Sequence, residues 1–226
     1  MALGATALLL AGLAFWPQYL SRSPADVDGY THLHAAFGTA WLGVVIAQAS
    51  LMARGKLAWH RRVGRSTWLL APGFVLSGLL LAHFRFSRMT PERFAAEAPT
   101  LYLPISASLL FALAWGLGVA LRHRRPLHAR LMAATVVPLI DPVVGRILFF
   151  YLPPLPTPVL YQAITYSLAV LLLIAMTATL PPASADRRTF RRFAVASVVV
   201  MALWFGLPLT SWWTAFGEWF RSLPLT

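Results

Sequence analysis

The feature that most constrains this sequence is a run of mostly apolar residues about as long as a bilayer is thick, from Thr31 to Ala53. In an α-helix, about 20 such residues at ~1.5 Å of rise each cross a hydrocarbon core of about 30 Å. Within that core every backbone amide and carbonyl must find a partner in the chain, and a helix pairs them all. The run therefore predicts a membrane-spanning helix.

The same pattern recurs along the 226 residues, of which 58% are hydrophobic and 12% are charged. Soluble domains are only about 45–50% apolar, so an integral membrane protein is indicated. We predict an all-α polytopic bundle, a single transmembrane domain over residues 1–226, with a short interfacial helix near 211–222. The first segment lacks a basic leader and a clear cleavage site, so we expect it to be retained. The seven predicted spans lie near 2–20, 31–53, 66–86, 101–121, 129–150, 158–180 and 193–211.

Basic residues favour one orientation of these spans. Most of the 19 Lys and Arg residues fall in alternate connections, whereas the remaining connections and the tail balance Arg against Asp and Glu. Cytoplasmic loops retain the Lys/Arg excess, so we expect a cytoplasmic N-terminus and an outside C-terminus in a bacterial inner membrane. Short basic turns suit anionic lipid headgroups rather than nucleic acid. These residues are Arg54, Lys56, Arg61, Arg62 and Arg65, then Arg122, Arg124, Arg125 and Arg130, then Arg187, Arg188, Arg191 and Arg192.

The predicted helix near 129–150 is interrupted by proline and carries charges at membrane depth. Pro138 and Pro142 each lack an amide hydrogen, so we expect a kink or break there. Asp141 lies between them, and Arg146 follows. A charge at the bilayer centre costs about 2.5–3.5 kcal/mol, which makes such residues candidates for a functional site. The alternatives are an Asp141–Arg146 ion pair and a carboxylate that caps the freed backbone.

Two histidines, His34 and His83, lie at similar depth near the outward ends of the second and third predicted helices. Residues two apart on a helix point about 200° from each other, so His32 cannot share a face with His34. We expect His34 to face the interior and His32 to lie at the rim. Because the chain has no cysteine, a haem would need histidine or another non-thiolate ligand.

These residues predict an outward-facing intramembrane pocket that binds haem b or a quinone. His34 and His83 would ligate the haem iron, and ordinary packing is the alternative for His83. Asp141, Arg146 and Tyr166 are the other expected cofactor-binding residues. Further polar side chains that could line the pocket are Tyr102, Tyr161, Gln162 and Thr165.

At the cytoplasmic boundary, His60 and His128 could form an inner-face site, or they could simply face water and lipid phosphates. A second haem stacked above the first is not expected. His60 and His83 are 23 residues apart, which is about 34 Å along a helix and exceeds the core thickness of about 30 Å.

A resemblance to a known family follows from three motifs: H-x-H with F-G-x-x-W and Q, then W-H-R-R-V-G-R, then H-A-R-L-M with a deeper Arg. They resemble a family of bacterial polytopic inner-membrane proteins of unknown function, over about a third of the chain. The resemblance implies a fold and a membrane location but no reaction. Position 129 departs from it, with Ala in place of a basic residue, and Asp141 has no counterpart. The matching positions are His34, Gly38, Gln48, His60, Arg61, Gly64, Arg65, His128, Met132 and Arg146. A looser likeness to membrane b-type cytochromes rests on the number of histidines.

Together these features favour a redox-linked membrane protein that binds haem or quinone. Two alternatives belong to other classes. One is a non-catalytic accessory subunit whose basic turns hold a membrane-protein partner, and the other is a small-solute transporter that uses the interrupted helix. No hydrolase motif such as G-x-S-x-G or H-E-x-x-H occurs in the sequence, so an enzyme of that kind is not indicated.

Overall fold

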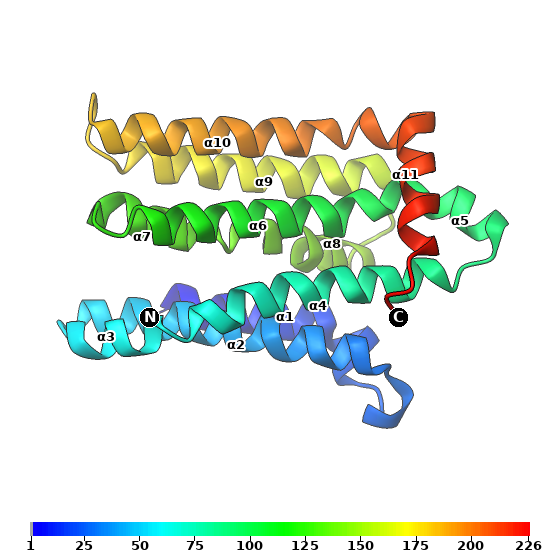
Figure 1. Ribbon diagram of the computed structural model, residues 1–226, viewed down its shortest axis with the longest axis horizontal. Helices are drawn as coiled ribbons and strands as arrows, with labels where there is room; N and C mark the ends of the chain where they lie inside the picture. Colours follow the sequence, from blue (N-terminus) through cyan, green and yellow to red (C-terminus); the bar gives the residue numbers. More distant parts are fainter. Residues whose placement is uncertain (1) are drawn as a thin grey trace. The chain divides into compact units, whose positions relative to one another are not determined.

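The computed structural model describes residues 2–226, and this part of the chain forms helices and turns without any strand (Figure 1). Its α-helices are α1 (Ala2–Phe15), α2 (Gly29–Ala53), α3 (Leu57–Gly64), α4 (Thr67–Ser87), α5 (Pro91–Glu97), α6 (Tyr102–Ala120), α7 (Arg125–Ala134), α8 (Ile140–Tyr151), α9 (Pro158–Ala178), α10 (Ala185–Leu203) and α11 (Ser211–Ser222).

Six helical stretches of the described chain are long and apolar enough to cross a membrane. They confirm the prediction of an all-α polytopic membrane fold. The first predicted segment forms the shorter helix α1, followed by a single π-helical turn at Trp16–Leu20. The count of seven spans and the cytoplasmic N-terminus stay predictions. The six stretches are Gly29–Ala53, Leu57–Ser87, Pro91–Ala120, Arg125–Tyr151, Pro158–Ala178 and Ala185–Leu209.

Helix α10 begins at Ala185, well before the predicted start near 193. The side chain of Ser184 caps the helix by accepting a hydrogen bond of 3.0 Å from the amide of Arg187. Arginine has a high helix propensity, so the polar segment continues the apolar one as a single helix. Hydropathy marks only the apolar part, which is why the predicted start was wrong. The helix predicted near 211–222 is present as α11.

The interruption predicted from the prolines is confirmed. Helix α7 ends at Ala134, a 3-10 turn covers Val137–Leu139, and α8 begins at Ile140. Pro142 falls in the first turn of α8, where a missing amide hydrogen leaves no helical bond unmade. Asp141 therefore lies at the start of a new helix, where the macrodipole favours a negative charge.

The contacts divide the chain into two compact units, each made of two separate segments. The first comprises the chain up to Phe74 together with Leu139–Ala169, and the second comprises Val75–Pro138 together with Val170–Thr226. The boundaries cross α4 and α9 within the helices and fall beside α8 at the proline break. A single domain over residues 1–226 stays a prediction.

In the first unit, α1 packs on α8, and α2 packs on the first part of α4. The hydroxyl of Tyr151 on α8 donates to the carbonyl oxygen of Leu13 at 2.9 Å. The contact between α2 and α4 depends on a missing side chain, because a Cβ on Gly73 would lie 2.2 Å from Cε1 of Phe37. Close approach of two helices at a glycine is common in membranes, where packing replaces the hydrophobic effect as the driving force.

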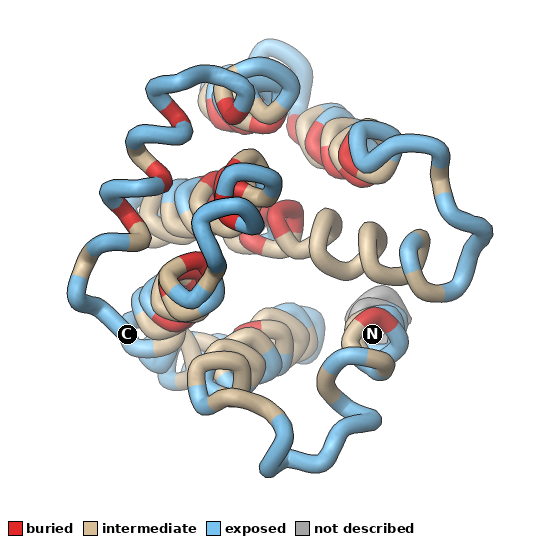
Figure 2. The backbone as a smooth tube through the Cα atoms, turned by 90° about the vertical axis from the view of Figure 1, so that its right-hand side faces the viewer, coloured by how far each residue is buried: buried red, intermediate tan, exposed pale blue. Residues whose placement is uncertain are grey.

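In the second unit, α6 and α7 form a helical hairpin against α10, and α11 covers one end. Side chains of α11 take part in a cluster of buried aromatic and aliphatic residues. Figure 2 marks the buried positions of the chain in red. The indole Nε1 of Trp213 donates to the carbonyl oxygen of Ala98 at 3.0 Å. The ring of Phe94 packs closely against Gly217, because a Cβ added to this glycine would lie 2.8 Å from Cζ of Phe94.

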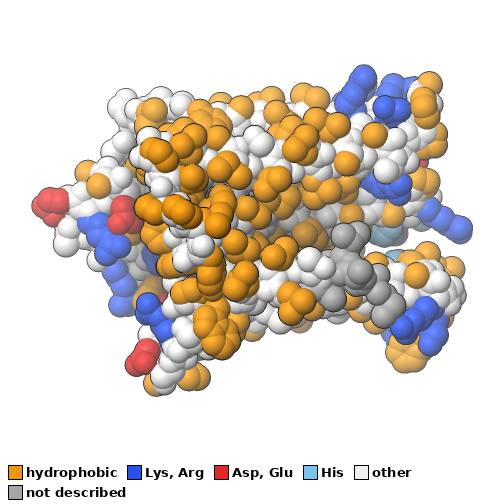
Figure 3. Space-filling model, turned by 180° about the vertical axis from the view of Figure 1, so that it is seen from behind, with side chains coloured by type: hydrophobic (Ala, Val, Ile, Leu, Met, Phe, Trp, Pro, Cys, Tyr) orange, Lys and Arg blue, Asp and Glu red, His pale blue; other side chains and the backbone are white. Residues whose placement is uncertain are grey.

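Large apolar side chains are exposed along the long helices, as Figure 3 shows for one face. On α10 these exposed residues begin at Val195 and continue through Val199 and Leu203. Exposed apolar surface of this extent would be unfavourable in water but is the surface that contacts lipid chains. The burial pattern therefore agrees with a chain that lies in a bilayer.

Candidate functional site

The first unit holds a polar cluster at the start of α8, built around the carboxylate of Asp141. The hydroxyl of Thr165 on α9 donates to Oδ1 of Asp141 at 2.7 Å. The amide Nε2 of Gln162, one turn earlier on α9, reaches Oδ2 at 3.4 Å. Both donors are buried, with Thr165 0% and Gln162 6% exposed. Each carboxylate oxygen thus has a side-chain donor from the facing helix.

Arg146 supplies positive charge beside this cluster. It lies on α8 slightly more than one turn beyond Asp141, and its guanidinium interacts electrostatically with that carboxylate. Its Nη1 donates to the carbonyl oxygen of Pro142 at 2.9 Å. The guanidinium carbon lies 4.7 Å from the ring centroid of Phe15 on α1, within the range of a cation–π interaction. Helix α1 therefore takes part in positioning Arg146.

Local structure explains why α8 and α9 meet here. The connection between them is short, and its Leu155 amide donates to the hydroxyl of Tyr161 at 3.1 Å, which holds the loop against the start of α9. A Cβ on Gly145 would lie 3.9 Å from Cγ2 of Thr165, an ordinary contact distance. The two helices thus approach closely enough for a short threonine side chain to reach Asp141.

The predicted residue Tyr166 follows Thr165 on α9 and is partly exposed. Because one residue turns a helix by about 100°, it points to a different side from the Thr165 hydroxyl. Tyr102, another predicted lining residue, belongs to the second unit and donates to the carbonyl oxygen of Val200 at 2.5 Å. Tyr102 thus ties α6 to α10, which is a packing role.

His34 lies in the first unit, where its ring stacks on Phe74 with centroids 4.8 Å apart. His32 is held elsewhere, by Tyr19 and by the carbonyl oxygen of Pro24, each at 3.0 Å. Because a carbonyl can only accept, Nε2 of His32 is the donor to Pro24. The two rings therefore have separate surroundings, as their spacing predicts.

His83, the other predicted iron ligand, lies in the second unit and is only 1% exposed. Its Nδ1 lies 2.7 Å from the hydroxyl of Thr226, and its ring meets Phe220 edge to face. Its Nε2 is buried without a hydrogen-bond partner in the described chain. A hydrogen-bonded Nδ1 with an available Nε2 suits an iron ligand, although the packed ring would first have to become accessible.

The inner-face histidines also belong to different units. His60 lies on α3, a short helix where we expected a turn, and its carbonyl oxygen accepts from Nε2 of Gln48 at 3.1 Å. His128 lies on α7, and its Nδ1 donates to the carbonyl oxygen of Gly118 at 2.7 Å. Each contact joins neighbouring helices within one unit.

Among residues 2–226, no group of three or more His, Cys, Asp or Glu side chains is placed to hold a metal ion. The structure brings together Asp141, Thr165 and Gln162, with Arg146 and Phe15 beside them. Sequence reasoning named Gln162 and Thr165 only as lining residues, and it missed Phe15, since no local signal connects α1 with α8.

The fold and its exposed apolar helices define the chain as a multi-pass helical membrane protein. Compared with known proteins, the chain matches no family model, no curated protein and no solved structure.

Proposed function

We propose that this chain is a membrane protein with a redox-linked role, and that the cluster at Asp141 binds the headgroup of a quinone. The observation that carries the proposal is a carboxylate in a membrane span with a buried side-chain donor at each oxygen. A quinone is soluble in the bilayer and carries polar oxygens on a flat ring. It therefore suits a polar site that is reached through lipid.

The side chains have complementary roles in this proposal. The Asp141 carboxyl group exchanges a proton with the headgroup. The Thr165 hydroxyl and the Gln162 amide fix the orientation of that carboxyl group. The Arg146 guanidinium offers hydrogen bonds to a quinone oxygen, since it carries several donors on a planar group. The ring of Phe15 keeps that guanidinium beside α8.

Quinone binding is tested with the full chain in phosphatidylcholine nanodiscs, by following the quenching of tryptophan fluorescence by decylubiquinone. Asp141→Asn keeps the size of the side chain but removes its charge. Hydrogen bonds to a charged group contribute about 1.5–3 kcal/mol, so we expect a Kd at least about tenfold higher. Glu218→Gln, which changes a half-exposed acid on α11, is the control and should leave the Kd unchanged. Equal affinity of the wild type and Asp141→Asn would refute the proposal.

A b-type haem is the second form of the proposal, and it is supported by the Nε2 of His83, which has no hydrogen-bond partner in the described chain and could ligate an iron. When bound, such a haem would supply one-electron chemistry. A dithionite-reduced minus oxidised spectrum of the purified protein tests it. The absence of an α-band would remove haem but leave the quinone proposal standing.

The interrupted helix favours a second candidate function, transport of a small solute. Half-helix ends near the middle of the membrane bind substrates and ions in several transporters, and Asp141 lies at such an end. Uptake of a solute into proteoliposomes that is lost in Asp141→Asn, without any quinone binding, would favour this candidate.

A further inference from the structure

The first two turns of α10 carry a dense group of arginines, which the sequence alone assigned to a loop. Arg188, Arg191 and Arg192 are exposed, and Arg187 is partly exposed. We call these four residues the α10 arginine surface. At ~100° per residue they fall within about 140° of the helix circumference. The buried Phe190 and Phe193 lie toward the opposite side of the helix, where α10 packs within its unit.

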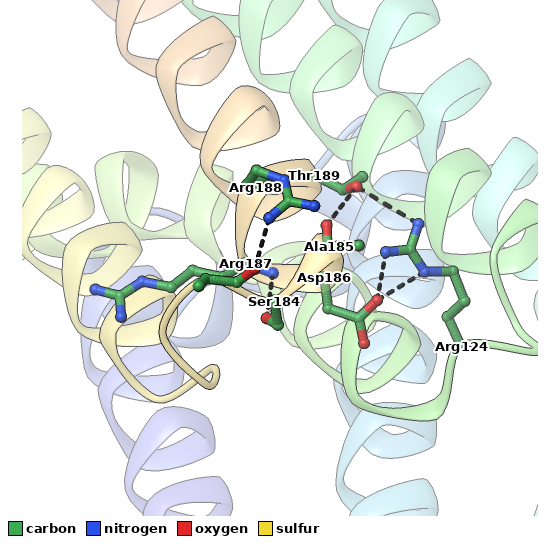
Figure 4. A network of polar contacts seen from close by, with 8 residues as sticks. Arg124, Ser184, Ala185, Asp186, Arg187, Arg188 and Thr189 are labelled. Carbon is green, nitrogen blue, oxygen red and sulfur yellow. Dashed lines mark hydrogen bonds and ion pairs between the residues drawn. The ribbon is translucent and has the colours of Figure 1, made fainter.

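The acidic residue nearest to this surface already forms an ion pair with another arginine. Asp186 pairs with Arg124 from the loop before α7, whose Nε lies 2.6 Å from Oδ1 (Figure 4). The side chain of Arg187 points away from this pair in the same view. Two more exposed arginines, Arg122 and Arg125, lie beside Arg124 in the sequence. Within residues 2–226, the α10 arginine surface therefore has no carboxylate of its own to balance it.

The arrangement is unfavourable without an external anion. Arg187 and Arg191 are four residues apart, as are Arg188 and Arg192, and like charges at this spacing repel each other on a helix. Arg187 and Arg188 also lie in the first turn of α10, where the helix macrodipole favours acidic residues. A bound anion would relieve both effects.

The position of the arginines along the helix identifies the source of that anion. Exposed apolar residues begin at Val195, and Arg188 to Arg192 precede it by about 4 to 10 Å at ~1.5 Å per residue. The headgroup layer of a bilayer occupies about 5–8 Å outside each side of the hydrocarbon core. The arginines thus lie at the depth of lipid phosphates.

We propose that the α10 arginine surface binds the phosphate groups of anionic phospholipids. The Arg124–Asp186 pair holds the start of α10 in place, and the guanidinium groups around it contact the lipid phosphates, for which their planar donors are well suited. The proposal is independent of the site at Asp141, which lies in the other unit.

The test measures binding of dioctanoyl phosphatidylglycerol to the full chain in a neutral detergent by native mass spectrometry. The variant Arg188→Gln/Arg191→Gln/Arg192→Gln removes three charges from the surface. Each basic residue near an anionic surface contributes about 1 kcal/mol, so we expect a Kd about a hundredfold higher. The control Arg85→Gln/Arg88→Gln/Arg93→Gln removes three exposed arginines around the α4–α5 end of the same unit and should bind as the wild type does.

Three outcomes would overturn the proposal. The first is equal loss in both triple variants, since net charge alone would then explain binding. The second is equal affinity for dioctanoyl phosphatidylcholine, which carries a phosphate but no net charge. The third is displacement of the lipid by inorganic phosphate at a similar concentration, which would indicate a site for free phosphate. The wild type gives an independent measure, because its Kd for phosphatidylglycerol should rise with added NaCl as the charges are screened.

Discussion

The contact between Gly73 and Phe37 provides a sharp test of how α2 packs on α4. In Gly73→Ala the new Cβ would lie 2.2, 2.5 and 2.8 Å from three atoms of the Phe37 ring. The ring would have to leave its rotamer or the helices would have to separate, and overpacking of this kind costs about 1–3 kcal/mol. Alanine also recovers up to about 1 kcal/mol of helix propensity relative to glycine. The net loss in the free energy of unfolding should therefore be up to about 2 kcal/mol.

Gly116→Ala is the matched control, because this glycine also lies inside a long helix, but a Cβ added to it would meet no described atom within 4 Å beyond the adjoining backbone of its own helix. It should be neutral or stabilising by up to about 1 kcal/mol. Thermal unfolding in detergent measures both variants. For a chain of this size 1 kcal/mol shifts Tm by about 2–4 °C, so Gly73→Ala should unfold several degrees below Gly116→Ala.

A second substitution locates the cause. In a Phe37→Ala background the ring is absent, so Gly73→Ala should no longer destabilise the protein and the two changes should be strongly coupled. If Gly73→Ala is as stable as Gly116→Ala in the wild-type background, the described packing of α2 on α4 is wrong.

Two other predictions concern the start of α10. Ser184→Ala removes the helix cap and should lower the free energy of unfolding by about 1 kcal/mol, measured by chemical denaturation in detergent. Ser184→Asp can still cap the helix and should retain most of the stability. Equal stability of the serine and alanine forms would contradict the cap. Arg124→Gln breaks the ion pair with Asp186. The side chain of Arg124 is 35% exposed and that of Asp186 is 21% exposed, so the loss in the free energy of unfolding should be about 1 kcal/mol or less and should shrink at high salt. Arg125→Gln, an exposed neighbour, should have no comparable effect, and a loss independent of salt would contradict an ionic origin.

The spans could be predicted because a backbone in lipid must pair its own polar groups, which a helix does, and because a long apolar run is visible in the hydropathy of the sequence. The break before Asp141 was predictable from the sequence because Pro138 has no amide hydrogen to donate within its own helix. The start of α10 was not predicted, because hydropathy does not register a polar helical extension. The serine cap that begins it is a weak signal on its own.

The candidate site was predictable only in part. Depth and cost of burial singled out Asp141 and Arg146, and the same reasoning placed Thr165 and Gln162 near them. The choice of Tyr166 as a binding residue depended on which side of α9 faces α8. The sequence alone does not specify that side. Phe15 and Thr226 illustrate the general difficulty, because their partners Arg146 and His83 are more than a hundred residues away.

The interleaving of the two units has a consequence for biosynthesis. A ribosome delivers this chain to the membrane from its N-terminus, yet the first unit needs Leu139–Ala169 and the second needs the segment from Val170 onward. Helices α2 to α7 therefore enter the bilayer before either unit has all its parts. Asp141 gains Thr165 and Gln162 only after α9 has followed α8, so the polar groups of the site must tolerate the membrane, or be shielded within the insertion machinery, until then. Truncation after residue 138 would leave both units incomplete.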